Sequence, residues 1–180
     1  MLKLIRPHHW IKNLLLFAAL FFSKSFFDTS KIILALEAFT LFSLLASSIY
    51  VINDIFDVER DRQHPTKKNR PIASGEISIK RAIIIALTLF FIAMTGALLI
   101  SLNFAYVLLA YFIINIFYSA KLKHVVIIDA FVVAFGFVLR VVAGALAIDV
   151  RVSHWILICT FTLALFLAFG KRRGQKSFFL

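Results

Sequence analysis

Long apolar segments alternate with short polar connections along nearly the whole chain. A helix that crosses the hydrocarbon core of a bilayer needs about 20 apolar residues, and somewhat shorter segments cross when their ends lie in the interface. Six segments approach this length: residues 12–27, 31–55, 80–101, 104–119, 125–148 and 154–170. The pattern predicts an all-α fold, a polytopic transmembrane bundle of these six helices that forms a single domain over residues 1–180.

The composition also indicates a membrane protein. The sequence is 62% hydrophobic, whereas about half of the residues in a soluble domain are apolar. The net charge is +11, but the basic residues cluster at the ends of the apolar segments, where they interact with anionic lipid head groups. The charge therefore predicts a bilayer as partner and no nucleic acid. The single cysteine, Cys159, excludes an internal disulfide.

The distribution of basic residues predicts the orientation of the bundle. With a cytoplasmic N-terminus, the connections on the cytoplasmic side contain all Lys and Arg residues except Lys24, Lys31 and Arg151, and Arg140, which lies within a span. Cytoplasmic connections of membrane proteins carry such an excess of positive charge. We therefore expect a multi-pass protein of the cell membrane, with the N-terminus and the polar segment after the second span on the cytoplasmic side.

This polar segment, residues 53–75, contains the candidate chemistry. Asp54, Asp57 and Asp61 recur at i, i+3 and i+7, which places three carboxylates on one face of a helix, with Asn53 beside them. Carboxylates this close repel one another unless a cation neutralises them, and oxygen ligands suit Mg²⁺. Mg²⁺ usually completes its coordination with water and phosphate oxygens, so the pattern favours a phosphorylated substrate.

The basic residues that follow fit the same interpretation. Lys67, Lys68 and Arg70 would balance the remaining phosphate charge. The spacing alone leaves a second interpretation open, a solvated loop whose acids and bases pair with each other.

The motif resembles a known one. The segments NDIFDVERD at 53–61 and RPIASG at 70–75 resemble the first aspartate-rich motif of the UbiA superfamily of intramembrane prenyltransferases. Four further segments resemble the decaprenyl-phosphate phosphoribosyltransferase branch of this superfamily: RPHHWIKN at 6–13, DRQHPTK at 61–67, YSAKLK at 118–123 and GFVLR at 136–140. The resemblance extends from Arg6 to about Lys171.

The resemblance implies a specific reaction. It implies Mg²⁺-dependent transfer of 5-phosphoribosyl from phosphoribosyl diphosphate to a polyprenyl phosphate, with Asp54, Asp57 and Asp61 as catalytic metal ligands. The residues that it implies for substrate binding are Asn53, Lys67, Arg70, Tyr118, Lys123, Asp129 and Arg140. The superfamily is expected to have about nine spanning helices around a central cavity, so six imply a chain truncated at its C-terminus.

Two alternative functions stay open. One is the commoner reaction of the superfamily, prenyl transfer from a prenyl diphosphate to an aromatic acceptor, which uses the same leaving group. The other is a truncated, inactive membrane scaffold or lipid-binding protein. The sequence leaves the oligomeric state open.

Three local interpretations also stay open. Residues 1–10 alternate basic and bulky apolar side chains, which predicts an interfacial helix, although Arg6, Lys12 or Asn13 could instead line the mouth of the site. Asp129 is a single acid beside Lys123, where many superfamily members have a second aspartate-rich motif, so the sequence leaves open whether a second Mg²⁺ binds. Arg140 lies deep in a span and needs either a polar group of another helix or an anionic ligand as its partner.

Overall fold

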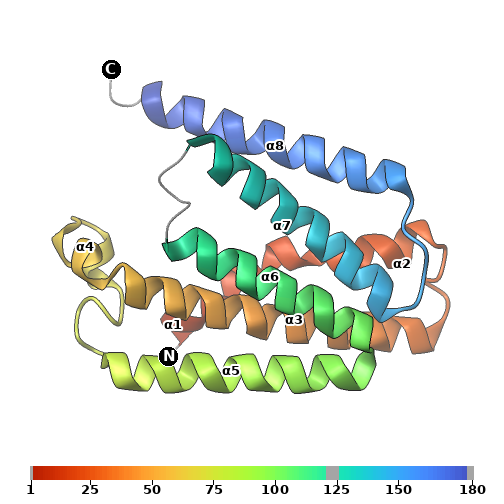
Figure 1. Ribbon diagram of the computed structural model, residues 1–180, viewed down its shortest axis with the longest axis horizontal. Coiled ribbons are helices and arrows are strands. Elements are labelled where there is room, and N and C mark those ends of the chain that lie inside the picture. The colour runs from red at the N-terminus through yellow and green to blue at the C-terminus, as the bar shows by residue number, and fades with distance from the viewer. Residues whose placement is uncertain (1, 121–125, 178–180) are drawn as a thin grey trace.

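A computed structural model describes residues 2–120 and 126–177, and the described residues form helices and connections without a β-strand (Figure 1). The elements in chain order are α1 (Leu2–Ile5), η1 (Pro7–Phe17), α2 (Ala18–Phe22), α3 (Thr29–Phe56), α4 (Val58–Gln63), η2 (Lys67–Asn69), α5 (Ile79–Ile100), α6 (Leu102–Ala120), α7 (Val126–Ala147) and α8 (His154–Ser177). The predicted all-α bundle is confirmed.

Four helices of the described chain are long and apolar enough to cross a membrane: Thr29–Phe56, Ile79–Ile100, Leu102–Ser119 and Ile127–Ala147. They correspond to the second, third, fourth and fifth predicted spans. The sixth predicted span is also helical, and its apolar part, His154–Gly170, is shorter. These helices identify a multi-pass membrane protein.

The first predicted span differs from the expectation of one helix over residues 12–27. The chain instead forms the 3₁₀ helix η1 and then the short α-helix α2, which ends at Phe22. A 3₁₀ helix rises about 2.0 Å per residue, against about 1.5 Å in an α-helix. The segment is therefore more extended than the predicted helix, and it packs against α3 and α7.

Close backbone contact accompanies the unusual geometry of η1. A Cβ atom added to Gly144 in α7 would lie 2.0 Å from the carbonyl oxygen of Leu16. Only a glycine permits this approach, because any side chain there would overlap the backbone of η1. Gly144 therefore sets how closely the first segment packs onto α7.

Helix α3 occupies the middle of the bundle, with α5 along one side and η1, α6 and α7 against its other faces (Figure 1). The buried side chains of α5 are all small: Ala82, Ala86, Ala93 and Ala97. Small residues let membrane helices approach closely, and here the hydroxyl of Ser48 donates a hydrogen bond to the carbonyl of Ala86 at 2.8 Å. The pair of α3 and α5 thus forms a rigid support for the polar segment between them.

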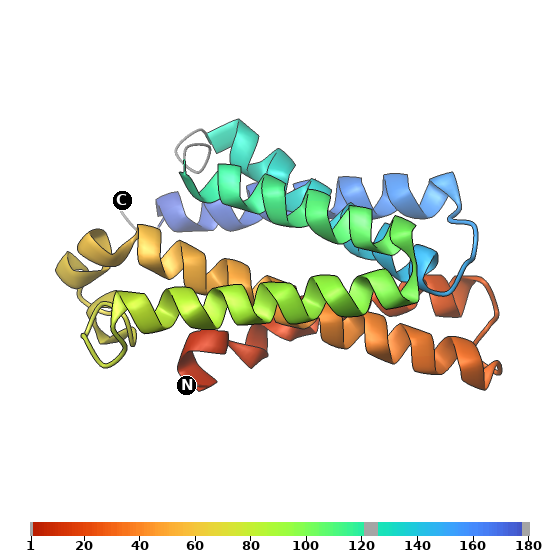
Figure 2. The same ribbon diagram turned by 60° about the horizontal axis from the view of Figure 1, so that its bottom comes forward.

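The polar segment lies at one end of the bundle. Figures 1 and 2 show α4, the N-terminal helix α1 and the C-terminal end of α6 toward this same end. Leu4 of α1, Val51 of α3 and Ile72 of the loop are all buried in one apolar cluster. This cluster anchors the N-terminal segment and the loop against the end of α3.

Candidate active site

The helix that carries Asp54 is interrupted at Asp57, before Asp61. Helix α3 ends at Phe56 and α4 begins at Val58, with Asp57 between them at φ −97° and ψ 5°. The backbone N–H of Asp57 donates to the carbonyl of Asn53 at 3.0 Å, and that of Asp61 to the carbonyl of Asp57 at 2.8 Å. Helical hydrogen bonding thus continues across the break, which keeps Asp54 and Asp61 on the same side of the chain.

Asp54 and Asp61 form a buried pair around one guanidinium group. Their exposed fractions are 2% and 3%. Nη1 of Arg70 lies 3.0 Å from Oδ1 of Asp54 and 2.6 Å from Oδ2 of Asp61. One positively charged nitrogen therefore occupies the position where the two carboxylates converge. Buried carboxylates require such compensation, because burial without a partner costs several kcal/mol.

The loop that carries Arg70 is held by local contacts. Nδ1 of His64 accepts a hydrogen bond from the backbone N–H of Thr66 at 3.3 Å, and Nε of Arg62 donates to the carbonyl of Ala73 at 3.3 Å. Ile72 is buried beneath the loop. These contacts fix the segment on both sides of Arg70 and point its side chain at the carboxylates.

A second arginine reaches the pair from the other end of the sequence. Nη2 of Arg6 donates to both carboxylate oxygens of Asp54, at 2.6 and 2.7 Å. Arg6 has a left-handed backbone conformation, φ 53°, between α1 and η1, which turns its side chain toward α3. Of the two interpretations of the N-terminal segment, the structure thus shows Arg6 at the candidate site.

The donor set of this pair fits Mg²⁺. Mg²⁺ prefers carboxylate oxygens and is usually bound through one or two carboxylates together with substrate phosphates and water. Asp54 and Asp61 already converge on one cation, the Arg70 guanidinium. Within the described part of the chain, no group of three His, Cys, Asp or Glu side chains is placed to hold a metal. The structure thus brings two of the three predicted ligands together and leaves Asp57, half-buried at the helix break, outside the pair.

The remaining predicted residues of the polar segment lie around the pair. Asn53 is half-buried one position before Asp54. Lys67 is exposed in η2, on the same loop as Arg70. Both stay predictions as substrate contacts.

Tyr118 and Asp129 form a separate contact between two helices. The hydroxyl of Tyr118 in α6 donates a hydrogen bond to Oδ1 of Asp129 in α7. The two residues therefore join the cytoplasmic ends that the sequence predicts for these helices. Lys123 lies outside the described residues.

Arg140 is buried in the interior of the bundle, with an exposed fraction of 5%. Its Nε donates to Oδ1 of Asn13 at 2.8 Å, Nη1 to the carbonyl of Gly136 at 2.7 Å, and Nη2 to the hydroxyl of Tyr111 at 2.8 Å. The guanidinium carbon also lies 5.4 Å from the centre of the Phe42 ring. Of the two predicted kinds of partner, the structure supplies polar groups of the surrounding elements, and substrate binding by Arg140 stays a prediction.

Two further hydrogen bonds join the N-terminal segment to α3, and the sequence did not predict them. Nδ2 of Asn13 donates to the hydroxyl of Ser43 at 3.0 Å, and Nε1 of Trp10 to the hydroxyl of Ser47 at 3.0 Å. The one available signal was Asn13 itself, an amide at the start of an apolar segment, where an unpaired polar group is costly. Its partners in α3 follow from tertiary packing alone.

Comparison with known protein families identifies the family of this chain. The model of the UbiA prenyltransferase family matches residues 14–172. The chain belongs to the UbiA prenyltransferase family. The resemblance found in the sequence is thereby confirmed, and the aspartate pair lies within the matched range.

Curated relatives of this UbiA family chain include decaprenyl-phosphate phosphoribosyltransferases. The protein of Mycolicibacterium smegmatis is 38% identical over 97% of this chain and 56% of its own length. That of Corynebacterium glutamicum is 38% identical over 97% of the chain and 54% of its own length. That of Mycobacterium tuberculosis is 35% identical over 96% and 59%. The chain thus spans little more than half the length of these relatives.

Solved structures of the family share the fold. The UbiA homolog from Archaeoglobus fulgidus bound to GPP and Mg²⁺ superposes with a TM-score of 0.74 at 26% identity, over 91% of this chain and 59% of the solved chain. The same homolog bound to DMAPP and Mg²⁺ also gives 0.74, at 25% identity. The helical arrangement described above is therefore that of the UbiA family.

Proposed function

We propose that this chain is part of a Mg²⁺-dependent transferase that moves 5-phosphoribosyl from phosphoribosyl diphosphate to a polyprenyl phosphate at the cytoplasmic face of the cell membrane. The observation that carries the proposal is the buried pair Asp54 and Asp61, which converges on one cation at the polar end of the bundle. The choice of substrates is supported by the three relatives, each a decaprenyl-phosphate phosphoribosyltransferase.

In this proposal Asp54 and Asp61 would hold Mg²⁺, and the ion would supply positive charge against a departing diphosphate. Arg6 already pairs with Asp54, and Arg70 pairs with both Asp54 and Asp61. With the carboxylates engaged by a metal ion, these guanidinium groups would be available to phosphate oxygens, which arginine binds in a bidentate manner. Their positive charge then stabilises the leaving group while C1 of the ribose develops positive character.

The proposed acceptor sets few demands on the protein. A polyprenyl phosphate is already an anionic nucleophile, so no side chain has to remove a proton from it. This agrees with a site built from carboxylates and arginines. We propose that further residues contact the metal or the substrates: Asp57, Asn53, Lys67, Tyr118, Lys123 and Asp129.

A transfer assay tests the proposal. Membranes that carry the protein, expressed with any in-frame continuation of its gene, are given labelled phosphoribosyl diphosphate and a polyprenyl phosphate. We expect an organic-extractable lipid sugar whose formation stops with EDTA and with Asp61→Asn. Glu59→Gln is the matched control, because Glu59 is an exposed acid in the same helix α4. Label that stays aqueous, with the protein abundant, would overturn the proposal.

Prenyl transfer is the second candidate, because the Archaeoglobus fulgidus homolog of the same fold is solved with prenyl diphosphates and Mg²⁺. The same membranes are therefore also given a prenyl diphosphate and a hydroxybenzoate-type acceptor. Prenylated product without lipid sugar would favour this reaction. Neither product, from abundant and intact protein, would favour a scaffold or lipid-binding role.

The proposed orientation has its own test. In a Cys159→Ser background, a single cysteine replaces either the exposed Thr66 near α4 or the exposed Ser153 before α8. An impermeant maleimide added to intact cells should label the cysteine at 153 and not that at 66. The reverse pattern would place the aspartate pair on the outer face.

A further inference from the structure

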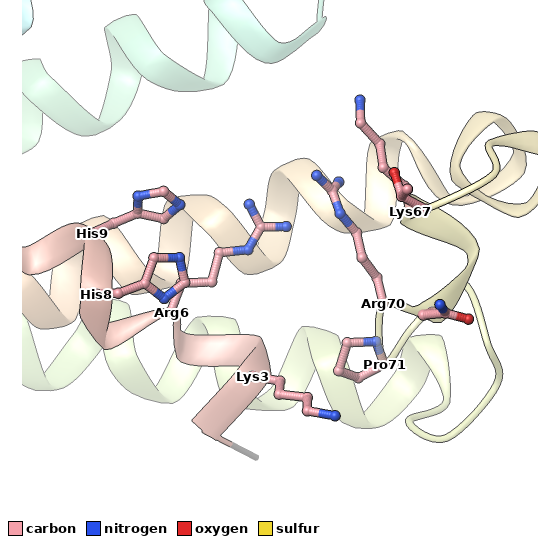
Figure 3. A pocket seen from close by; sticks show the side chains of 9 residues that line it. Lys3, Arg6, His8, His9, Lys67, Arg70 and Pro71 are labelled. Atoms are coloured by element: carbon pink, nitrogen blue, oxygen red, sulfur yellow. The ribbon is translucent and has the colours of Figure 1, made fainter.

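A basic groove lies beside the aspartate pair, between two segments that are far apart in the sequence. It is a cavity of about 370 Å³. Lys3, Arg6 and His8 of the N-terminal segment form one wall, and Lys67 and Arg70 of the loop form the other (Figure 3). Figure 3 shows the guanidinium groups of Arg6 and Arg70 extending toward each other from these two walls. We call this cavity the basic groove.

Buried residues and aromatic contacts hold the two walls of the basic groove in place. Leu4 is next to Lys3 in the chain, and Ile72 comes two residues after Arg70. Leu4 and Ile72 are both buried in one apolar cluster at the end of α3. On the N-terminal wall, the ring of His9 packs against that of His8 at 4.2 Å and against that of Tyr50 at 5.1 Å between centroids. The groove is therefore preformed, which lowers the entropic cost of binding a ligand.

The charge of the basic groove identifies the class of ligand. Its described lining contains four Lys and Arg side chains and no Asp or Glu. Asp54 and Asp61, buried behind it, neutralise Arg6 and Arg70. Two positive charges remain, those of the exposed Lys3 and Lys67. A phosphate monoester carries about −1.5 to −2 at pH 7, so it matches this surplus.

We propose that the basic groove binds a phosphate monoester, next to the aspartate pair and independently of a metal ion. The assignment of the ligand rests on the proposed function, in which two such groups occur: the 5-phosphate of the sugar donor and the phosphate of the lipid acceptor. Both have the same charge and the same acceptor oxygens. A groove beside the carboxylates brings either phosphate close to the diphosphate of the donor.

Binding of ribose 5-phosphate to the protein in lipid nanodiscs, measured by calorimetry in EDTA, tests the basic groove. We expect binding of ribose 5-phosphate and none of ribose. Lys3→Ala and Lys67→Ala should each weaken it, together by about tenfold or more, because each removes one charge-assisted contact. Lys80→Ala is the matched control, since Lys80 is an exposed lysine at the start of α5 that does not line the groove. Affinity that is equal in the wild type and the double variant would overturn the proposal.

A competition arm separates the two sources of phosphate. Geranyl phosphate, a short lipid phosphate, is titrated against bound ribose 5-phosphate in the wild type, and each of the two ligands is then titrated separately into the Lys3→Ala and Lys67→Ala double variant. If the variant loses ribose 5-phosphate alone, the groove binds the donor phosphate. If it loses geranyl phosphate alone or both ligands, the groove binds the lipid phosphate or either one.

Failure of the groove proposal and failure of the proposed function would give different results. Groove binding that depends on Lys3 and Lys67, without any lipid sugar in the transfer assay, would leave the phosphate site standing and overturn the proposed reaction. Lipid sugar formation at unchanged KM for phosphoribosyl diphosphate and polyprenyl phosphate in the double variant would overturn the groove and leave the reaction standing.

Discussion

Nη2 of Arg6 lies 2.6 and 2.7 Å from the two carboxylate oxygens of Asp54, although 48 positions separate these residues in the chain. This ion pair fastens the N-terminal segment to the end of α3. Asp54 has an exposed fraction of 2%, so solvent cannot replace the lost partner. We expect Arg6→Ala to lower the free energy of unfolding by about 2 kcal/mol, because the buried carboxylate of Asp54 then keeps one of its two arginine partners among the described residues, Arg70.

A double-mutant cycle measures this pair. Asp54→Asn removes the charge that Arg6 compensates, so Arg6→Ala should cost less in the Asp54→Asn background than in the wild type, by about 1 kcal/mol or more. Thermal unfolding in detergent provides the measurement. Costs that simply add would show that the contact contributes nothing to stability.

Arg70 occupies the position where Asp54 and Asp61 converge, so it competes with a metal ion for them. We expect Arg70→Gln to strengthen Mn²⁺ binding in the absence of substrate, since the two carboxylates lose their shared positive charge. Electron paramagnetic resonance of bound Mn²⁺ measures the affinity. Arg81→Gln is the control, because it removes the same charge from an exposed arginine in the first turn of α5. Weaker Mn²⁺ binding in Arg70→Gln than in the control would contradict this competition.

Asp57→Asn should lower turnover far more than membrane abundance. Asp57 is half-buried at the helix break, so little packing is lost with its charge. The substitution removes the third predicted metal ligand, and we expect turnover to fall at least about tenfold, the effect of about 1.4 kcal/mol in the barrier. Abundance and Mg²⁺-dependent transfer are compared in the same membranes. Unchanged turnover at equal abundance would remove Asp57 from the metal site.

Arg140→Leu should reduce the amount of folded protein. The substitution leaves the amide of Asn13 and the hydroxyl of Tyr111 without the donors of Arg140 in the bundle interior, at a cost of about 1–3 kcal/mol for each unsatisfied group. Size-exclusion chromatography and thermal unfolding report the loss. Normal yield together with a raised KM for one substrate would instead show that Arg140 binds that substrate.

Gly144→Ala should destabilise the contact between η1 and α7. The added Cβ would lie 2.0 Å from the carbonyl oxygen of Leu16, and a backbone atom cannot move aside as a flexible side chain can. We expect a loss of about 3 kcal/mol in the free energy of unfolding. Gly170→Ala is the matched control, because a Cβ at Gly170 meets no atom within 4 Å. Equal melting temperatures for the two variants would show that η1 can shift freely.

The sequence by itself determined the helical bundle and the identity of the acidic motif. The spans at 31–55, 80–101, 104–119 and 125–148 follow from apolar length, which the bilayer imposes on each segment separately. The candidate metal ligands also follow from local spacing, because Asp54 and Asp61 lie within two helical turns. Such features depend on neighbouring residues and need no knowledge of how the helices pack.

Only the tertiary structure decided which groups meet. Arg6 and Arg70 reach Asp54 from 48 and 16 positions away, and Arg140 meets Asn13 across 127 positions of the chain. Whether two distant side chains touch depends on the rotation and depth of each helix in the bundle, which the packing of small residues sets. The geometry of η1 has the same origin, because the close approach at Gly144 involves two segments whose contact no local pattern encodes. The candidate site therefore combines a local motif, Asp54 and Asp61, with two arginines, Arg6 and Arg70, that tertiary packing brings to it.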